Sequence, residues 1–146
     1  LIATDPTVKY LSGKVTIYST SPEMSRKAMV YYLDMSFGDR EGLITSKNPE
    51  TCTSEQAAFF KEMFTGADYK ENYAILNNYV KSLGDSIPPF IHLYIGLSPT
   101  MKTFGTTFDP DFGDCYDTAM IITAADIYPD KYKRYVESYE KCKVRK

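Results

Sequence analysis

The sequence predicts an all-α fold: a compact, single-domain bundle of about five helices around one long central helix. The central helix is expected from Thr53 to Leu83, because Thr53 and Gln56 have the spacing of a capping box and Gly84 suits a left-handed C-cap. Apolar residues within it recur at spacings of three and four, namely Tyr69, Tyr73, Leu76, Val80 and Leu83. Shorter helical patterns, separated by Pro and Gly, lie on both sides of this stretch.

Two segments precede the central helix. Residues 1–20 are expected to be an extended leader packed on the bundle. Val15 and Ile17 alternate with polar residues as in a strand, but no second strand is predicted to pair with them. The next helix is expected to start at Ser21-Pro22-Glu23, which combines an N-cap serine, a proline at the first helical position and an acid near the positive end of the helix dipole. Asn48-Pro49 then breaks the chain.

Three further helices are predicted after Gly84. A short apolar helix covers Phe90 to Leu97, and the two glycines and Pro110 between Phe104 and Gly113 indicate a loop. Asp114 is a candidate cap for a helix whose apolar residues run from Ala119 to Ile127. Pro129 starts the last helix, with Tyr132, Tyr135, Val136 and Tyr139 on one face. These patterns together predict the bundle.

Composition limits the domain organisation and the partners. With 146 residues, 43% hydrophobic and 25% charged, residues 1–146 are expected to form one domain, with the leader at 1–20 and a basic tail at 142–146. The net charge of −2 gives no basic field, so no nucleic-acid partner is expected. Apolar runs are too short for a membrane span. Leu1 in place of Met suggests a secreted chain after removal of a signal peptide, and a chain trimmed for another reason would begin in the same way.

Three cysteines allow one disulfide. Cys142 is expected on the apolar face of the last helix and Cys115 at the start of the helix before it, so an antiparallel helix pair would bring them together. Cys52 would then be free. The alternative is three buried thiols, if the protein is never oxidised.

The sequence contains little that indicates a catalytic or metal-binding site. His92 lies between Ile91 and Leu93 and is expected to be a partly buried packing residue. Asp109 to Asp114 resembles a calcium loop only weakly, because position twelve is Met120 where a bidentate Glu is needed. No HExxH, CxxC or phosphate-binding glycine loop occurs. The sequence therefore predicts no enzyme activity, no cofactor and no metal.

Charges are segregated near the C-terminus. Between Thr103 and Asp130 there are six acids and no base, namely Asp109, Asp111, Asp114, Asp117, Asp126 and Asp130. Residues 131–146 contain seven bases against Glu137 and Glu140. One interpretation is a solvated loop beside a solvated tail. The other is a basic patch that contacts anionic lipid or an acidic partner.

Several strings occur in the order found in one known family. They are Phe37-Gly38-Asp39-Arg40-Glu41-Gly42-Leu43-Ile44, the run from Thr53 to Phe60, Tyr69 with Tyr73, and the run from Asn78 to Gly84. The closing run from Ile127 to Tyr132, followed by Tyr135 and Glu137, fits the same order. In this order and spacing the chain resembles the abalone sperm lysin family of acrosomal proteins, over most of Met24 to Lys141.

The resemblance implies a five-helix bundle and a non-enzymatic role in fertilisation. It implies a secreted protein of the sperm acrosomal vesicle, released at the acrosome reaction. The partners would be egg membrane lipid or an egg-coat glycoprotein, with a homodimer as one assembly. The family's basic surface tracks have no counterpart here, since the central helix carries only Lys61, Lys70 and Lys81.

These observations favour a protein that promotes fusion of sperm and egg membranes. Its expected membrane or partner contacts are Met29, Tyr32, Leu33, Phe60, Phe64, Lys143, Arg145 and Lys146. The apolar members of this set are equally consistent with a bundle core. Two alternatives remain: binding and opening of the egg vitelline envelope, and a secreted carrier that holds a small apolar ligand in a cavity lined by Tyr and Met.

Overall fold

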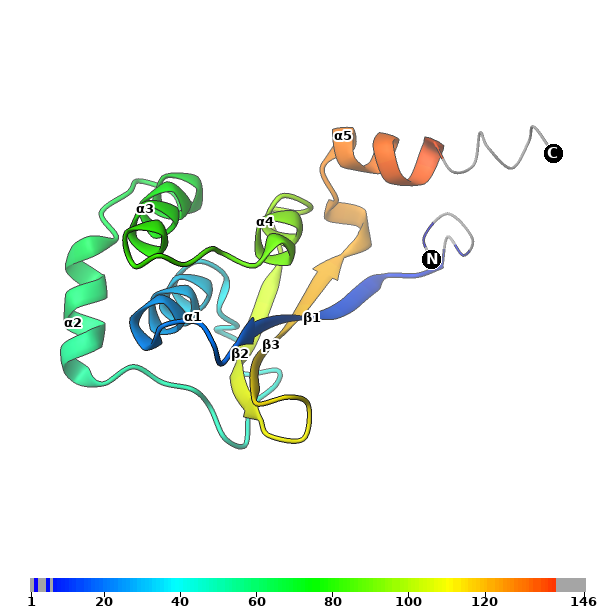
Figure 1. The fold of residues 1–146 in the computed structure, drawn as a ribbon. Helices are drawn as coiled ribbons and strands as arrows, with labels where there is room; N and C mark the ends of the chain where they lie inside the picture. The colour runs from blue at the N-terminus through cyan, green and yellow to red at the C-terminus, as the bar shows by residue number, and fades with distance from the viewer. Residues whose placement is uncertain (1, 3–4, 6, 139–146) are drawn as a thin grey trace.

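The computed structural model describes residues 2, 5 and 7–138 and has a mixed α/β fold (Figure 1). Three strands, β1 (Tyr10–Tyr18), β2 (Lys102–Asp109) and β3 (Cys115–Thr123), form one antiparallel sheet in the order β1-β3-β2. The helices are α1 (Glu23–Phe37), α2 (Ser54–Met63), α3 (Tyr69–Ser82), α4 (Pro89–Ile95) and α5 (Pro129–Tyr132). The predicted all-α bundle is therefore wrong.

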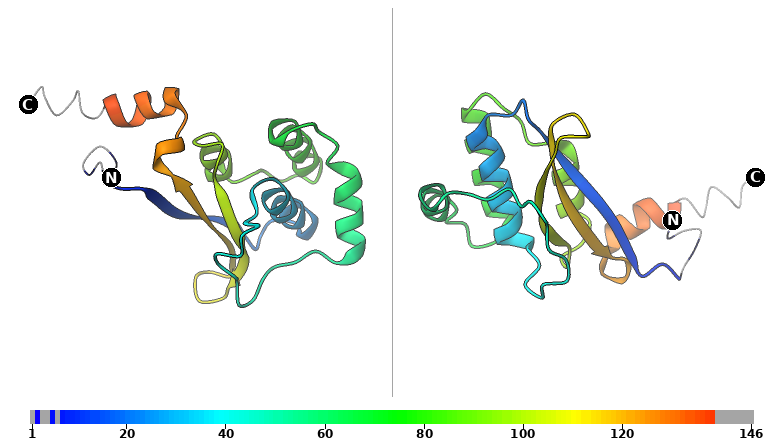
Figure 2. Two further views of the ribbon diagram at one scale, coloured as in Figure 1. Left: turned by 180° about the vertical axis from the view of Figure 1, so that it is seen from behind. Right: turned by 90° about the horizontal axis from the view of Figure 1, so that it is seen from below.

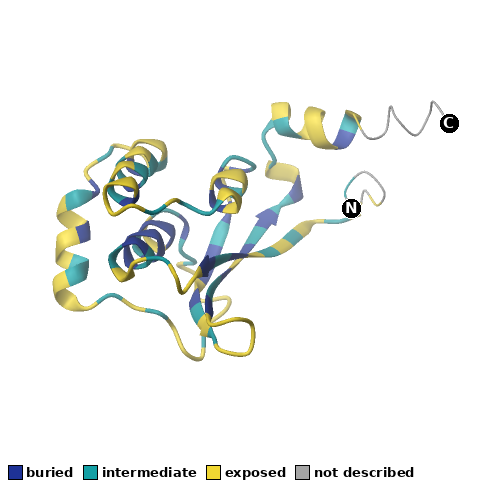
Figure 3. Ribbon diagram, viewed as in Figure 1, coloured by how far each residue is buried: buried dark blue, intermediate teal, exposed yellow. Residues whose placement is uncertain are grey.

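One face of the sheet is packed against helices. α1 and α4 lie against it, and α2 and α3 lie beyond α1 (Figures 1 and 2). The strands turn alternate apolar side chains to this face, where they are buried (Figure 3): Val15, Ile17, Met120 and Ile122. The opposite face carries exposed side chains, among them Ser12, Lys14 and Ala119.

The expected leader contains strand β1. The alternation at Val15 and Ile17 is that of a real strand, and both side chains are almost completely buried. β1 pairs with β3 along its whole length, from Tyr10 opposite Thr123 to Tyr18 opposite Cys115. The expectation that a strand here would lack a partner is therefore wrong, because its partner lies in a segment that was predicted to be helical.

Helix α1 begins at Glu23, one residue later than predicted from an N-cap at Ser21 and a first helical residue at Pro22, and ends at Phe37. Pro22 occupies the N-cap position without a side-chain hydrogen bond. The helix is buried on several sides because it lies between the sheet and the outer helices. This position explains why its sequence is apolar almost all round.

The predicted central helix is two helices. The capping box at its start is confirmed, since Thr53 accepts a hydrogen bond from the Gln56 backbone and Gln56 caps Thr53 in return. The helix then ends at Met63, and Asp68 caps α3 by accepting from the backbone N–H groups of Lys70 and Glu71. The acid at position 68 starts a new helix where a continuous one was expected.

The link between α2 and α3 requires glycine at position 66. Its backbone N–H donates to Asn72 Oδ1 at 2.9 Å, and its carbonyl accepts from Asn72 Nδ2. A Cβ at Gly66 would lie 2.7 Å from Glu71 Cβ. The close approach of Gly66 to Glu71 and Asn72 thus belongs to a turn between two helices.

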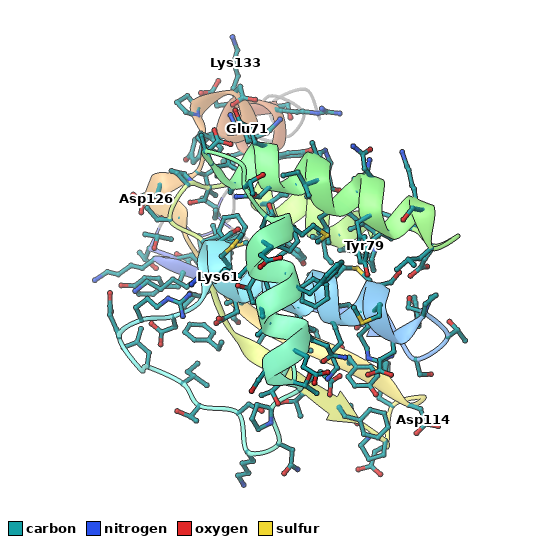
Figure 4. All side chains as sticks on the ribbon, turned by 90° about the vertical axis from the view of Figure 1, so that its left-hand side faces the viewer. Lys61, Glu71, Tyr79, Asp114, Asp126 and Lys133 are labelled. Carbon is teal, nitrogen blue, oxygen red and sulfur yellow. The ribbon has the colours of Figure 1, made fainter. Side chains whose placement is uncertain are left out.

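Strand β3 replaces the helix predicted around Ala119 to Ile127. The loop expected between Phe104 and Gly113 is likewise mostly strand β2, and the chain reverses between Asp109 and Cys115. Gly113 and Asp114 both have positive φ at this reversal. Asp114 and Asp126 lie at opposite ends of the sheet (Figure 4), so the acids of this region do not form one cluster.

The two short helices agree better with the sequence. Helix α4 covers Pro89–Ile95, close to the predicted Phe90 to Leu97, and the last helical segment starts at Pro129 as expected. It continues as a π-helical segment, Lys133–Glu137. Within residues 2, 5 and 7–138, no helix is both long and apolar enough to span a membrane.

Leu76 is fully buried in the core between α1 and α3. Leu76→Ala is expected to lower the free energy of unfolding by about 2–5 kcal/mol, because it removes buried methyl groups and leaves a cavity. Urea denaturation would measure the loss. Leu83→Ala is the matched control, since Leu83 follows α3 and is 38% exposed, so it should cost much less. Equal effects of the two changes would contradict this core.

Candidate functional site

The apolar side chains that were expected to contact a membrane are in the core. Met29, Tyr32, Leu33, Phe60 and Phe64 are at most 7% exposed. In this fold they offer no apolar surface to a lipid or a partner. The three basic residues of the same prediction, Lys143, Arg145 and Lys146, lie outside the described residues.

Aromatic rings fill the space between α1, α2 and α3. Tyr79 points from α3 toward the other two helices (Figure 4), and its ring centre lies 6.3 Å from that of Phe60. Phe60 in turn packs on Tyr31, at 5.5 Å between ring centres, and on Phe64. These rings pack against one another, which leaves no support for the predicted ligand cavity lined by tyrosines at this place.

The cysteine and histidine predictions have mixed outcomes. Cys115 is buried, but it opens a strand, not a helix, and its thiol donates to the carbonyl oxygen of Phe112 at 3.1 Å. Cys142 lies outside the described residues, so the disulfide remains a prediction. His92 is exposed on α4, with its ring centre 5.4 Å from that of Tyr73, so the expected partial burial is wrong.

A pocket of about 380 Å³ lies between α1, the segment 49–52 and strand β2. It combines apolar walls with polar groups, the usual character of a small-molecule site. Its lining residues on α1 are Val30, Tyr31, Leu33 and Asp34. The remainder of the lining is Pro49, Glu50, Thr51, Cys52, Ala57, Thr103, Gly105, Thr106 and Thr118.

Backbone contacts hold the segment 49–52 against the sheet. Pro49 forms an isolated bridge to Thr107, and the Glu50 N–H donates to the carbonyl oxygen of Thr106 at 2.7 Å. The register of β2 shifts between Thr103 and Thr106, and Gly105 in this irregular stretch has a φ of +83° that favours glycine. The bulge and the bridge together place Glu50 at the edge of the pocket.

Three charged side chains form the Glu50 cluster, defined as Arg26, Lys27 and Glu50. Glu50 Oε1 lies 2.7 Å from Lys27 Nζ and 3.5 Å from Arg26 Nε, and their side chains are only 11–17% exposed. Lys27 Nζ also donates to the carbonyl oxygen of Thr51, and the Arg26 guanidinium lies over the Tyr116 ring at 4.2 Å. Glu50 Oε1 therefore lies against both cations, whereas no described side chain donates a hydrogen bond to Oε2.

Three buried threonines, Thr103, Thr106 and Thr118, form the sheet side of the pocket. The hydroxyl of Thr103 donates to the carbonyl oxygen of Leu33 at 3.2 Å, and the hydroxyls of Thr106 and Thr118 share a hydrogen bond of 2.7 Å. Each threonine is at most 2% exposed. Buried hydroxyls paired in this way are fixed in orientation, so this wall is preorganised.

Cys52 lies in the pocket wall, with its thiol 3.8 Å from the carbonyl oxygen of Lys27. Burial raises the pKa of this thiol, and the positive charge of Lys27 only partly opposes the effect. The thiolate is the nucleophilic form of cysteine, so Cys52 is poorly activated at neutral pH. The geometry therefore favours a binding role for this residue over a nucleophilic one.

The raised pKa predicts slow alkylation of Cys52. At pH 8 iodoacetamide should modify it more slowly than an unperturbed cysteine peptide, and the rate should reach half its maximum at a pH above the usual range for a thiol. Mass spectrometry of the digested protein would follow the peptide that contains Cys52. A rate faster than that of the free peptide would show that the thiol is activated.

Sequence reasoning missed this pocket. Its charged residues come from α1 and from the segment before α2, and its threonines come from two strands that were predicted as loop and helix. The available signal was Lys27, a lysine on a helix that is otherwise apolar on nearly every side. Among the described residues, no group of three or more His, Cys, Asp or Glu is placed to hold a metal ion.

Comparison with known proteins identifies two curated relatives. A protein of Phocaeicola vulgatus is 38% identical over 136 residues, which is 93% of this chain and 41% of the relative. A protein of Bacteroides thetaiotaomicron is 38% identical over 137 residues, which is 92% of this chain and 40% of the relative. Both are named glycine N(alpha)-acyltransferase. The chain thus spans about two-fifths of the length of these relatives.

Protein-family models and solved structures give no match to the chain. The two bacterial relatives nevertheless correct the functional predictions from the sequence. The resemblance to the sperm lysin family is wrong, and so are the roles in membrane fusion and egg-coat binding, the carrier alternative, the egg partners and the secreted acrosomal location. The prediction of a non-enzymatic protein is also contradicted, because both relatives carry the name of an enzyme.

Proposed function

We propose that this chain contributes the acceptor site of an N-acyltransferase, which joins an acyl group to the amino group of glycine or a similarly small amino acid. The observation that carries the proposal is 38% identity to two proteins of that name along more than nine-tenths of the chain. Identity at this level over 136 residues supports a common fold and related chemistry. The pocket between α1, the segment 49–52 and β2 is the proposed binding site.

The contents of the pocket suit an amino acid with an acyl group attached. The charged residues of the lining are two acids, Asp34 and Glu50. Arg26 and Lys27 lie outside the lining but against Glu50, where their two charges exceed its one and favour the acceptor's carboxylate at that edge. Glu50 Oε2 can accept a hydrogen bond from the acceptor's amino group. Apolar walls from Val30, Leu33 and other residues leave room for the first carbons of an acyl chain, because 380 Å³ exceeds what glycine alone would fill.

The proposed reaction uses an activated acyl donor, for which a thioester is the simplest chemical class. The amino nitrogen attacks the thioester carbonyl carbon, the C–N bond forms and the C–S bond breaks. Glu50 Oε2 takes the proton that the nitrogen loses, and this proton then passes through solvent to the departing thiolate, which restores the Glu50 carboxylate. Glu50 thus acts as a general base, a role that typically accelerates a reaction by about 10²–10⁴-fold.

The test is a transfer assay with two proteins. One is the 146-residue chain, and the other is a hybrid in which this chain replaces the matched 136 residues of the Phocaeicola vulgatus relative. Each is incubated with isotopically labelled glycine and a long-chain acyl thioester, and the products are identified by mass spectrometry. N-acylglycine formed in proportion to enzyme, above thioester hydrolysis, is the expected result. Thioester cleavage without label in the product would contradict transfer to glycine.

A further inference from the structure

The two edges of the sheet differ in whether another segment of the chain pairs with them. The outer edge of β2 is occupied, since Gly38 bridges Thr103, Pro49 bridges Thr107, and the Asp39 N–H donates to the Thr103 carbonyl oxygen at 2.9 Å. The other edge is β1, which pairs with β3 alone among the described segments (Figure 2). A free edge presents a row of N–H and C=O groups that can pair with another strand.

The register identifies which groups point outward from β1. Ala124 N–H donates to the Lys9 carbonyl oxygen at 2.8 Å, so Lys9 and Ala124 belong to a hydrogen-bonded pair. Hydrogen-bonded and non-bonded pairs alternate along an antiparallel ladder. The odd-numbered residues from Leu11 to Ile17 therefore bond to β3. The even-numbered residues direct their backbone N–H and C=O groups to the free edge: Tyr10, Ser12, Lys14 and Thr16.

β1 lacks the features that usually protect an edge strand. It has nine residues, no proline and a continuous register without a bulge. Lys14, the charged residue at the centre of β1, pairs with Asp117 on the neighbouring strand, with Nζ 2.5 Å from Oδ2. Its ammonium group therefore does not block pairing of another strand at the free edge. The inward side chains of Val15 and Ile17 are fully buried, which fixes the strand in place. The edge thus has a regular register, and no other segment among residues 2, 5 and 7–138 pairs with it.

We propose that the free edge of β1 is where a further β-strand of an acyltransferase polypeptide joins this sheet. The relatives contain about three-fifths of their length beyond the match, and a strand from such sequence is the occupant that this edge suits. The strand would bond to the outward groups of Ser12, Lys14 and Thr16 and extend the sheet past β1. The identity of this occupant rests on the proposed function, whereas the free edge rests on geometry alone.

Amide exchange at residue resolution tests the proposal without any substrate. In the isolated chain, the outward amides of Ser12, Lys14 and Thr16 should exchange rapidly, while the inward amides of Val15 and Ile17 are protected. In the hybrid with the Phocaeicola vulgatus relative, the outward amides should slow by at least about tenfold. Equal exchange in both proteins, or a hybrid that does not fold, would overturn the proposal. If the protection of these amides in the isolated chain increased with protein concentration, the occupant of the edge would be a second copy of the chain, which would contradict the proposal.

A pair of substitutions isolates the backbone contribution. Thr16→Pro removes one outward N–H, whereas Thr16→Val keeps it, and both lose the hydrogen bond from the Thr16 hydroxyl to Asp117. In the hybrid, Thr16→Pro should lower Tm more than Thr16→Val does, and in the isolated chain the two variants should differ little. The same difference in both proteins would contradict pairing at this edge. Because stability and exchange are measured, an absence of acyl transfer would not affect the outcome.

Discussion

Lys27→Met is expected to lower the free energy of unfolding by about 3 kcal/mol or more, because it removes one partner of a buried ion pair. Lys27 Nζ lies 2.7 Å from Glu50 Oε1 and also donates to the Thr51 carbonyl oxygen. Its loss leaves a carboxylate that is 17% exposed with only Arg26 at 3.5 Å. Urea denaturation followed by circular dichroism would measure the change.

Lys14→Met is the control for this prediction. Lys14 also pairs with an acid, Asp117, at 2.5 Å, but its side chain is 50% exposed and solvent screens the pair. The midpoint of unfolding should therefore change little. Combining Lys27→Met with Glu50→Leu should recover part of the lost stability, since neither partner of the Lys27–Glu50 pair is then left alone, and Arg26, which loses Glu50, still lies over the Tyr116 ring. If the Lys14 and Lys27 variants lost equal stability, the Glu50 cluster would not be a buried ion pair in solution.

Glu50→Gln is expected to lower kcat for acyl transfer to glycine by about 100-fold or more, the usual loss when a general base is removed. Glutamine keeps the shape of the side chain and an oxygen that accepts from Lys27, but Arg26 and Lys27 lose their counter-charge, so the free energy of unfolding must be measured beside kcat and the assay run where the variant is folded. The KM for glycine should change less than kcat, because the cations that attract the acceptor's carboxylate remain. Steady-state kinetics of the hybrid would separate the two constants.

Glu41→Gln is the matched control for the kinetics. Glu41 also pairs with a lysine, with its Oε1 2.6 Å from Lys102 Nζ, but it lies outside the pocket lining and is exposed. Its loss should leave kcat unchanged. A kcat for the Glu50 variant within a factor of two of the unsubstituted hybrid would remove Glu50 from the proposed mechanism.

Local signals predicted the elements whose ends are set by neighbouring residues. The start of α1 at Glu23, the capping box at Thr53 and the helix start at Pro129 all depend on contacts within one turn. Such signals were sufficient for helix starts. They were insufficient for the helix end at Met63, because the stop and restart around Gly66 depends on the Asn72 side chain.

Strand β3 was missed because a short apolar run does not distinguish a strand from a buried helix. The run from Ala119 to Ile122 was read with the helical period. In the structure, Thr118, Met120 and Ile122 alternate with exposed or half-exposed residues and face the helices. Without β3, strands β1 and β2 had no partner, so the wrong assignments of β2 as a loop and β3 as a helix changed the predicted fold class from α/β to all-α.

The site depends on contacts between distant parts of the chain. Lys27 and Glu50 are 23 positions apart, and they meet because the backbone at Glu50 bonds to Thr106 on β2. Periodicity and capping do not carry that information. Short strings in a loose order also gave the wrong family resemblance, whereas the match to the Phocaeicola vulgatus relative is 38% identity over 136 residues.

The most direct test of the central proposal is to locate a bound N-acylglycine by NMR. The isolated chain would be titrated with a short-chain N-acylglycine while backbone amide shifts are followed. We predict the largest shifts at residues 50–52 and 103–106, and shifts at the same residues in the Glu50→Gln variant, which keeps both cations. Shifts confined to the open face of the sheet around Lys14 and Asp117, or no saturable shifts at millimolar ligand, would contradict it.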